Sequence, residues 1–321
     1  MQQSSSNILS IIIVSYNTKQ LLKECLNSIN DQNHNKEVEI IVVDNASSDE
    51  TVKMVKEYFP EIKLIENDKN MGFGVANNQG AAIARGEYLL LINSDTALEK
   101  NALNKMIAAA EKYEDAGAIG FKIMNSDRSL QSSCGNFPTL WNIIAEALFL
   151  DRIFKPKSSY HILNEKKYQN KFNPDWVSGS CFMIKKKVFD KVSGFDEKFF
   201  LYVEEVDLCY RIKQEGYKNY YFPIDTVIHY KHGGSSNKAP AIIFGYNNIL
   251  LFFKKHYFFG KFIQLYFFIM LKSIFYFFFG IIIGSISKKY YIQAINYGFL
   301  FLTLISRNKL KKYENSFKQQ D

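Results

Sequence analysis

Two groups of acidic residues, far apart in the sequence, have the types and surroundings needed for group-transfer chemistry. The first is Asp95, which follows the apolar run 89–92; a strand ending on an acidic residue places an oxygen ligand at the carboxyl edge of a sheet. The second is Glu204, Glu205 and Asp207, which follow an aromatic run where one pKa can be raised enough to give a general base. Together they suggest a divalent metal that holds a phosphorylated donor and a carboxylate that activates an acceptor. Each alone is also typical of a turn or a helix cap.

The residues that precede Asp95 alternate between strand and helix patterns. Continuous apolar runs rich in β-branched residues predict strands buried on both faces. Apolar positions at helical spacing, with cap residues before them, predict the helices between these strands. We expect strands at 8–15, 38–43, 62–65 and 88–92, with helices from about 18 to 29, 50 to 58 and 75 to 85. This order predicts a mostly parallel sheet with helices on both faces.

The following segment, up to residue 236, is less regular. Residues 155–171 read as a polar loop, and Asp207 is expected to cap its helix or to pair with Arg211 at the i+4 position. The other expected elements are a strand at 121–124, an apolar helix at 140–150, an ordered segment at 176–184, helices at 186–194 and 203–215, and short strands at 219–223 and 226–229.

The charge is distributed unevenly along the chain. The protein has a formal net charge of +8, but residues 1–244 hold 29 Lys plus Arg against 30 Asp plus Glu, whereas residues 245–321 hold 11 against 2. The basic excess therefore lies in the last quarter, next to aromatic runs such as 275–279. This asymmetry argues against nucleic acid as a partner and favours an anionic membrane surface.

The apolar character of the chain rises sharply after residue 244. Residues 262–287 contain one charged side chain, Lys272, and residues 290–306 contain none. A helix that crosses a membrane needs roughly 18 or more apolar residues. Polar residues interrupt both of these stretches, so the helices either cross a membrane or lie in one leaflet. We therefore expect a catalytic domain at 1–238 and a basic, aromatic, membrane-associated helical region at 239–321.

The cysteines and the N-terminus bear on the cellular compartment. Cys25, Cys134, Cys181 and Cys209 show no metal-ligand spacing, so neither a zinc site nor a disulfide framework is expected, and their scatter fits a reducing compartment. The polar start at residues 2–7 shows no cleavable secretory signal.

Five motifs occur in a characteristic order: Val14-Ser15-Tyr16-Asn17, Val42-Val43-Asp44-Asn45-Ala46-Ser47-Ser48-Asp49, Asn70-Met71-Gly72-Phe73-Gly74, Asn93-Ser94-Asp95 and Tyr202-Val203-Glu204-Glu205-Val206-Asp207-Leu208. On these motifs the chain resembles family 2 glycosyltransferases, in the rhamnosyltransferase-like branch, over about residues 8–236. The resemblance implies the GT-A fold, a nucleotide-sugar donor and inversion of the anomeric centre.

The resemblance also assigns roles to residues of the donor site. Asp44 would accept hydrogen bonds from a base N–H or a ribose hydroxyl, and the glycine segment would let the backbone approach the donor. For Asn77 and Asn78, helix capping is an equal alternative to contact with a phosphate or sugar. The implied donor-binding residues are Tyr16, Asn17, Asp44, Gly72, Asn77, Asn78 and Asn93.

The same resemblance implies a metal site and a catalytic base. Asn93 stands where the family has the first Asp of its D-x-D motif, so Asp95 would bind Mg²⁺ or Mn²⁺, with His229 or His232 as a further ligand. Glu205 matches the second residue of the family's E-D pair and is the expected base, with Glu204 as the fallback.

The acceptor site is implied less directly. Trp176 and Gly179 stand where the family shapes the acceptor site, and a core role is the equal alternative for the tryptophan. The implied acceptor is a glycan, and we expect this glycan to be linked to a lipid.

The predicted function is therefore an inverting, metal-dependent glycosyltransferase at the cytoplasmic face of the membrane, acting in surface polysaccharide synthesis. Its donor is dTDP-L-rhamnose first, with UDP-hexoses next. The alternative is a catalytically idle nucleotide- or glycan-binding scaffold of a polysaccharide assembly complex. A Rossmann dehydrogenase fits poorly because Asn77 stands at the third glycine position of the dinucleotide motif. A nucleotidyltransferase is disfavoured because the expected N-terminal basic phosphate loop is missing.

Overall fold

The computed structural model describes residues 9–32, 38–150, 153, 159–230, 239–284 and 287–318, and it shows an α/β fold around a large mixed sheet. The strands are β1 (Leu9–Ser15), β2 (Val38–Asp44), β3 (Lys63–Glu66), β4 (Tyr88–Asn93), β5 (Thr96–Leu98), β6 (Ala116–Asn125), β7 (Leu130–Gln131), β8 (Cys134–Gly135), β9 (Trp176–Val177), β10 (Cys181–Lys185) and β11 (Lys218–His229). β8 and β9 form a separate two-stranded sheet, and the others belong to the large one.

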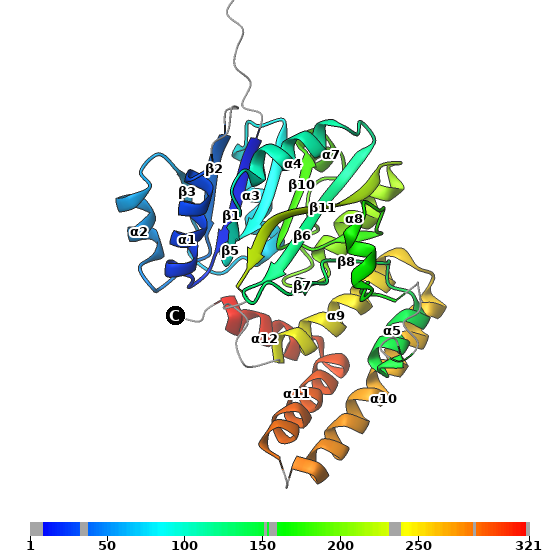
Figure 1. The fold of residues 1–321 in the computed structure, drawn as a ribbon. Helices are drawn as coiled ribbons and strands as arrows, with labels where there is room; N and C mark the ends of the chain where they lie inside the picture. The colour runs from blue at the N-terminus through cyan, green and yellow to red at the C-terminus, as the bar shows by residue number, and fades with distance from the viewer. Residues whose placement is uncertain are drawn as a thin grey trace, which may run out of the picture.

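Helices cover both faces of this sheet, and α10 and α11 extend away from it (Figure 1). They are α1 (Lys19–Asn30), α2 (Thr51–Tyr58), α3 (Phe73–Ile83), α4 (Ala102–Glu111), α5 (Leu140–Ala147), the 3₁₀ helix η1 (Glu165–Gln169), α7 (Lys186–Lys191), α8 (Glu204–Gln214), α9 (Ala239–His256), α10 (Phe259–Gly284), α11 (Lys288–Ile305) and α12 (Arg307–Lys318).

The N-terminal part of the sheet is parallel, as the sequence pattern predicts. The order β3-β2-β1-β4 brings the carboxyl ends of β1, β2 and β4 to one edge, where Ser15 pairs with Asp44 and Val14 pairs with Asn93. These strands are buried on both faces, which explains their unbroken apolar sequences. The expected strand and helix positions agree with the structure to within about two residues, the usual uncertainty of element ends.

The other half of the sheet differs from the sequence expectation in two places. The predicted strand at 121–124 is the end of a longer strand, β6, and the two short strands expected at 219–223 and 226–229 form one strand, β11, with irregular register against β6. The β-bulges around Pro223 explain why the sequence pattern looks interrupted there. The helix expected at 140–150 ends at Ala147. In the loop expected at 155–171, Glu165–Gln169 form η1 and His161 makes an isolated bridge with Gly135, whereas residues 155–158 lie outside the described residues.

Alternate residues of the central strands belong to two separate hydrophobic cores. Ile11, Ile13 and Val42 pack against α1, α2 and α4 on one face of the sheet. Ile12 and Val43 pack on the other face in a core that includes residues of α3, α7, α8, α9 and α10. The period-2 alternation of strand side chains thus builds a three-layer domain, and α9 contributes to its second core.

The C-terminal helices differ in how they are placed relative to the sheet. Helix α9 lies against the catalytic domain, where Phe252 and Phe253 are fully buried. Helices α10 and α11 pack against each other through close contacts at Gly280 and Gly298 and project away from the sheet (Figure 1). Among the described residues, α10 alone is long and apolar enough to cross a membrane. Its exposed side chains include Phe267, Leu271, Phe275, Phe278 and Ile282.

Candidate active site

The edge formed by the ends of β1, β2 and β4 presents an unsatisfied carboxylate oxygen. Asp44 is 1% exposed, and its Oδ2 accepts a hydrogen bond of 2.8 Å from the backbone N–H of Ser47. Its Oδ1 is buried and has no hydrogen-bond partner within the described residues. Burial raises the pKa of this carboxyl above its ordinary value. A buried acceptor of this kind is available to an N–H or O–H group of a ligand.

Asn17 contacts the turn that follows β2. Its backbone N–H donates to Ser47 Oγ, and its side-chain Oδ1 accepts from the backbone N–H of Ser48 at 2.8 Å. Asn17 has a positive φ of 52°, which Asn tolerates better than most residues. Its side-chain oxygen therefore shapes the edge beside Asp44, and Tyr16 precedes it at the end of β1.

The glycine segment 72–74 is explained by packing against the acidic motif. A Cβ on Gly72 would lie 2.6 Å from the backbone oxygen of Phe200, and Gly72 has a φ of +85°. A Cβ on Gly74 would lie 3.0 Å from Phe195 Cβ. Gly72 lets the segment touch the aromatic run before Glu204, and Gly74 lets it touch Phe195, so the structure supplies a reason for both glycines other than approach to a donor.

The two asparagines of α3 use their amides within the protein. Asn77 donates from Nδ2 to Phe73 O at 2.9 Å, one helical turn back. Asn78 bonds the backbone of Phe195 twice, donating from Nδ2 to its carbonyl and accepting through Oδ1 from its N–H. Asn78 therefore holds α3 to the 195 segment, and we leave both asparagines out of the donor site proposed below.

Strand pairing brings Asp95 and His229 together. β5 pairs antiparallel with β11, so that His229 lies opposite Thr96, the residue after Asp95. The distance from His229 Nε2 to Asp95 Oδ1 is 3.0 Å, and His229 Nδ1 lies 3.1 Å from Gln131 Oε1. His229 thus contacts Gln131 through Nδ1 and the Asp95 carboxylate through Nε2. The competing residue, His232, lies outside the described residues.

The Asp95–His229 pair has the spacing of two ligands of one cation. Two ligands bound at right angles, each about 2.1 Å from a Mg²⁺, lie about 3 Å apart. A metal-ligating histidine usually donates its other ring N–H to an oxygen, which is the position of Gln131. The residues described include no cluster of three or more His, Cys, Asp or Glu side chains for a metal. The pair therefore fits a divalent ion, which would need further oxygen ligands from a bound molecule and water.

The glutamate pair begins α8, immediately after two residues with unusual backbone angles. Tyr202 and Val203 have φ values of 70° and 71°, and a positive φ is a marked outlier for a β-branched residue such as valine. Oε2 of Glu204 and Oε2 of Glu205 are both buried and without a hydrogen-bond partner in the described structure. Burial raises the pKa of both carboxyls, and the charge of Glu205 raises that of Glu204 further.

The surroundings of Glu205 include residues from distant segments. A Cβ on Gly179 would lie 3.8 Å from Glu205 Cβ, and the Gly179 backbone N–H lowers the pKa that burial has raised. His161 acts in the same direction, and its Nδ1 lies 3.1 Å from both carboxylate oxygens of Glu146. We did not expect His161 or Glu146 from the sequence, because the segment between 125 and 175 carries no recognisable motif.

Trp176 adopts a core position close to this site. It is 4% exposed, and its indole N–H donates to Asn136 O at 3.0 Å. The rings of Tyr160 and His161 pack against it, with centroids 5.4 Å and 5.3 Å away. Of the two roles open to it in the sequence, these contacts favour the core role, in which Trp176 supports His161.

Asp207, two residues after Glu205, is surrounded by basic side chains. Its carboxylate lies 2.7 Å from Arg211 Nε, 2.8 Å from Lys255 Nζ and 2.7 Å from His256 Nε2. Burial by itself would raise the pKa of Asp207, but these partners hold it at about 2. The expected pair with Arg211 is confirmed, and Lys255 and His256 of α9 complete the group.

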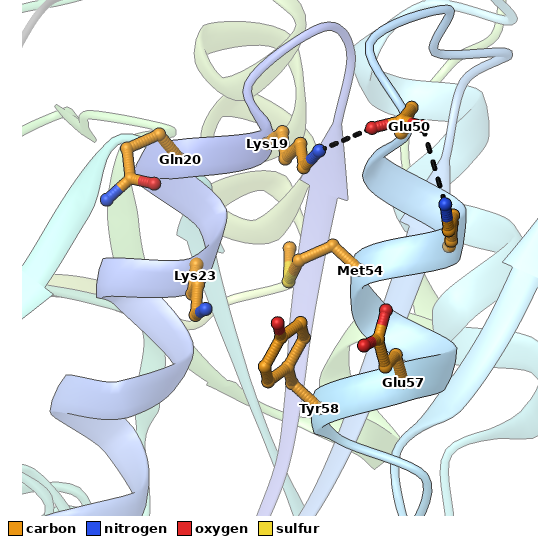
Figure 2. A pocket seen from close by; sticks show the side chains of 8 residues that line it. Lys19, Gln20, Lys23, Glu50, Met54, Glu57 and Tyr58 are labelled. Atoms are coloured by element: carbon orange, nitrogen blue, oxygen red, sulfur yellow. Dashed lines mark hydrogen bonds and ion pairs between the residues drawn. The ribbon is translucent and has the colours of Figure 1, made fainter.

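A separate hollow lies between α1 and α2 (Figure 2). Its volume is about 180 Å³, and Lys19 crosses it to reach Glu50 at 2.8 Å. The lining residues are Lys19, Gln20, Lys23, Glu50, Lys53, Met54, Glu57 and Tyr58. None of the acidic residues described above lines this hollow.

Comparison with known families identifies the class of protein. The model of glycosyl transferase family 2 matches residues 10–193, more than half of the chain. The chain belongs to this family and is a glycosyltransferase.

Two curated relatives narrow the similarity to rhamnosyltransferases. The chain is 30% identical to rhamnosyltransferase WbbL of Escherichia coli over 231 residues, covering 69% of this chain and 83% of that protein. It is 27% identical to the N-acetylglucosaminyl-diphospho-decaprenol L-rhamnosyltransferase of Mycobacterium tuberculosis over 252 residues, covering 74% of this chain and 80% of the relative.

Solved structures show the same fold. The mannosyltransferase PcManGT of Pyrobaculum calidifontis, in complex with GDP-Man and Mn²⁺, matches with a TM-score of 0.53 at 18% identity, covering 77% of this chain and 63% of that one. GalNAc-T7 with UDP, GalNAc and Mn²⁺ matches with a TM-score of 0.51 at 17% identity, covering 70% and 43%. The predicted GT-A fold is confirmed.

Proposed function

We propose that the protein is an inverting, metal-dependent glycosyltransferase in which Glu205 is the base. The segment 178–180 carries this proposal because it contacts both Glu205 and the strand end that precedes Asp95. Ser180 O accepts a hydrogen bond of 3.0 Å from the backbone N–H of Asn93, two residues before Asp95, and Gly179 packs beside Glu205. A donor held at Asp95 and an acceptor held at Glu205 would thus meet across one short segment.

In the proposed reaction, each group of the protein has a separate task. Asp44 Oδ1 accepts a hydrogen bond from the nucleoside, and Asp95 with His229 Nε2 would hold the divalent ion. When bound, that ion neutralises the charge that develops on the departing diphosphate. Glu205 takes the proton from the acceptor hydroxyl, which attacks the anomeric carbon from the face opposite the leaving group. The raised pKa of Glu205 suits a base, because a base whose pKa lies nearer the working pH accepts a proton more readily.

We further propose dTDP-L-rhamnose as the first donor to test and a lipid-linked glycan as the acceptor. Both curated relatives are rhamnosyltransferases, and the mycobacterial one is named for an N-acetylglucosaminyl-diphospho-decaprenol. The exposed apolar surface of α10 and the basic C-terminal quarter support attachment to an anionic membrane. On this proposal the enzyme works at the cytoplasmic face, in surface polysaccharide synthesis.

The donor is tested by thermal stabilisation with a panel of nucleotide sugars, with Mn²⁺, with Mg²⁺ and with EDTA. A ligand at about 100 times its Kd stabilises a protein by about 2.7 kcal/mol. We expect one donor to stabilise the protein only when a metal is present. Asp95→Ala should abolish this metal-dependent stabilisation, whereas Asp190→Ala, on the exposed face of α7, should keep it. Equal donor binding by Asp95→Ala and wild type in Mn²⁺ would show that the metal site is assigned wrongly.

Membrane attachment is tested by fractionation of the full-length protein. We expect it to sediment with membranes and to stay there in high salt, because the burial of apolar surface is not screened by ions. Recovery of the protein in the soluble fraction at low salt would contradict the membrane proposal and would favour a dimer interface on α10 and α11.

A further inference from the structure

The turn that presents the glutamate pair is held in an unfavourable backbone conformation. Tyr202 and Val203 both lie in the left-handed region, and Val203 directly precedes Glu204. Side chains with a Cβ rarely adopt this region, and such residues persist only where surrounding contacts impose the conformation. Some contact outside the turn must therefore maintain it.

Asn248 of α9 supplies that contact. Its side-chain Nδ2 donates to Leu201 O at 2.9 Å and to Tyr202 O at 3.0 Å, so both of its amide protons go to the two carbonyls of the turn. Asn248 is 7% exposed, and hydrogen bonds made in such a buried position are costly to lose. Leu201 and Tyr202 lie more than forty positions before Asn248, so this contact is entirely tertiary.

We propose that Asn248 is a positioning residue, which holds the 201–203 turn so that Glu205 faces the acceptor. This inference rests on the proposed role of Glu205 as the base. The hydrogen bonds of its side chain go to backbone carbonyls of the turn, and in this proposal Asn248 takes no part in the chemistry.

A second contact from the same helix supports this role. Two turns further along α9, Lys255 and His256 bind Asp207, at 2.8 Å and 2.7 Å. Helix α9 thus holds the start of α8 from both sides of the glutamate pair, through the turn before it and the carboxylate after it. Only Tyr257 and Phe258 separate α9 from α10, so the proposed membrane helix is connected through α9 to the turn before Glu204.

The chain contains a matched control at the neighbouring position. Asn247 donates from Nδ2 to Ile243 O and to Thr303 Oγ1, at 2.8 Å and 3.1 Å, and so bonds within the C-terminal helices. Asn247→Leu removes the same number of hydrogen bonds from the same helix as Asn248→Leu. Only the second variant releases the turn before Glu204.

The experiment uses full-length protein and measures release of nucleoside diphosphate from the donor that binds in the thermal panel. This readout reports transfer to water as well as to an acceptor. Wild type, Asn248→Leu, Asn247→Leu and Glu205→Gln are compared for donor Kd, for kcat and for the pH dependence of kcat. Asn248→Ser, which is smaller and cannot reach both carbonyls, serves if Asn248→Leu does not fold.

We expect Asn248→Leu to lower kcat by about 10- to 100-fold, the order of effect that misplacing a catalytic group produces, with donor Kd changed less than twofold. A loosened turn also admits water, so the acid limb of the pH profile should move to lower pH. The titratable groups that face Glu205 are Glu204, His161, Tyr160, Tyr202 and Cys209, and the variants leave all of them in place.

The outcomes separate the inference from the proposed function. Normal kcat in Asn248→Leu, with an inactive Glu205→Gln, would overturn the positioning role alone. Normal kcat in Glu205→Gln would overturn the role of Glu205 itself. An equal loss of kcat in Asn247→Leu and Asn248→Leu, or a loss of donor binding along with kcat, would mean that Asn248 supports only the general fold.

Discussion

Two carboxylates on the first turn of α8 have opposite environments in the folded protein. Asp207 is fully buried among Arg211, Lys255 and His256, which hold its pKa at about 2 despite burial. Glu205 has a buried oxygen without a hydrogen-bond partner in the described structure, and burial raises its pKa. They are two positions apart in the sequence, so the difference comes from what the rest of the chain brings to each.

The difference separates a structural carboxylate from a reactive one. A buried charge that is surrounded by partners stays ionised and stabilises the folded state only in that complete arrangement. A buried carboxylate without neighbouring cations has a raised pKa and therefore accepts a proton more readily. A pKa raised in this way suits a general base and is common at functional sites. The short sequence Glu-Glu-Val-Asp therefore contains a reactive and a structural carboxylate. Basic side chains of α9 contact the structural one, Asp207.

The largest expected effect is that of Glu205→Gln. The glutamine keeps the size of the side chain but cannot take a proton, so turnover should fall by about 10²- to 10⁴-fold while donor binding stays nearly normal. Steady-state kinetics together with the donor Kd measure the two effects separately. Turnover close to wild type would transfer the role of base to Glu204.

Asp207→Asn should act on stability. Removing the charge leaves Arg211 and Lys255 facing a neutral amide, and breaking a buried ion pair costs about 3–5 kcal/mol. Denaturant unfolding of the purified protein measures this loss. Asp190→Asn removes an exposed pair with Lys186 and should cost less than about 1 kcal/mol. Similar losses in the two variants would contradict the structural role of Asp207.

The two carboxylates should also respond at different pH. Glu205 must be ionised to act, so activity should fall as the pH drops through a value above the ordinary glutamate pKa of about 4.3. Asp207 has a lowered pKa, so its stabilisation is complete above the unfolded value of about 3.9 and is lost as the pH falls towards about 2. Activity and unfolding measured over the same pH range should show activity lost first. Simultaneous loss would mean that acid unfolding controls both.

The smallest effect is expected for Glu204→Gln. Burial and the neighbouring Glu205 raise the pKa of Glu204 well above its ordinary value, so a neutral glutamine resembles the form that is already favoured. Turnover should change by less than about tenfold, which is smaller than the loss of about 10²- to 10⁴-fold expected when a general base is removed. The acid limb of the activity profile should move little, because the side chain next to Glu205 is neutral in both proteins. A large shift of this limb in either direction would contradict the assignment of the pair.

The sequence alone predicts the features that depend on local pattern. The apolar runs and helical periodicities of the first hundred residues predict β1 to β4 and the helices between them, and the parallel order places Asp44 and Asn93 at one edge. The i+4 spacing predicts the pair of Asp207 and Arg211. These predictions hold because each depends on neighbouring residues or on a general rule about the carboxyl ends of parallel strands.

Only the tertiary structure decides which distant side chains meet these residues. It joins 219–223 and 226–229 into β11 and thereby places His229 beside Asp95. It directs the amide of Asn78 to Phe195 rather than to the site edge, and it brings His161 and Asn248 to the surroundings of Glu205. None of these contacts has a local signature, because pairing between segments far apart in the chain is determined by packing of the whole core and leaves no periodicity in the sequence.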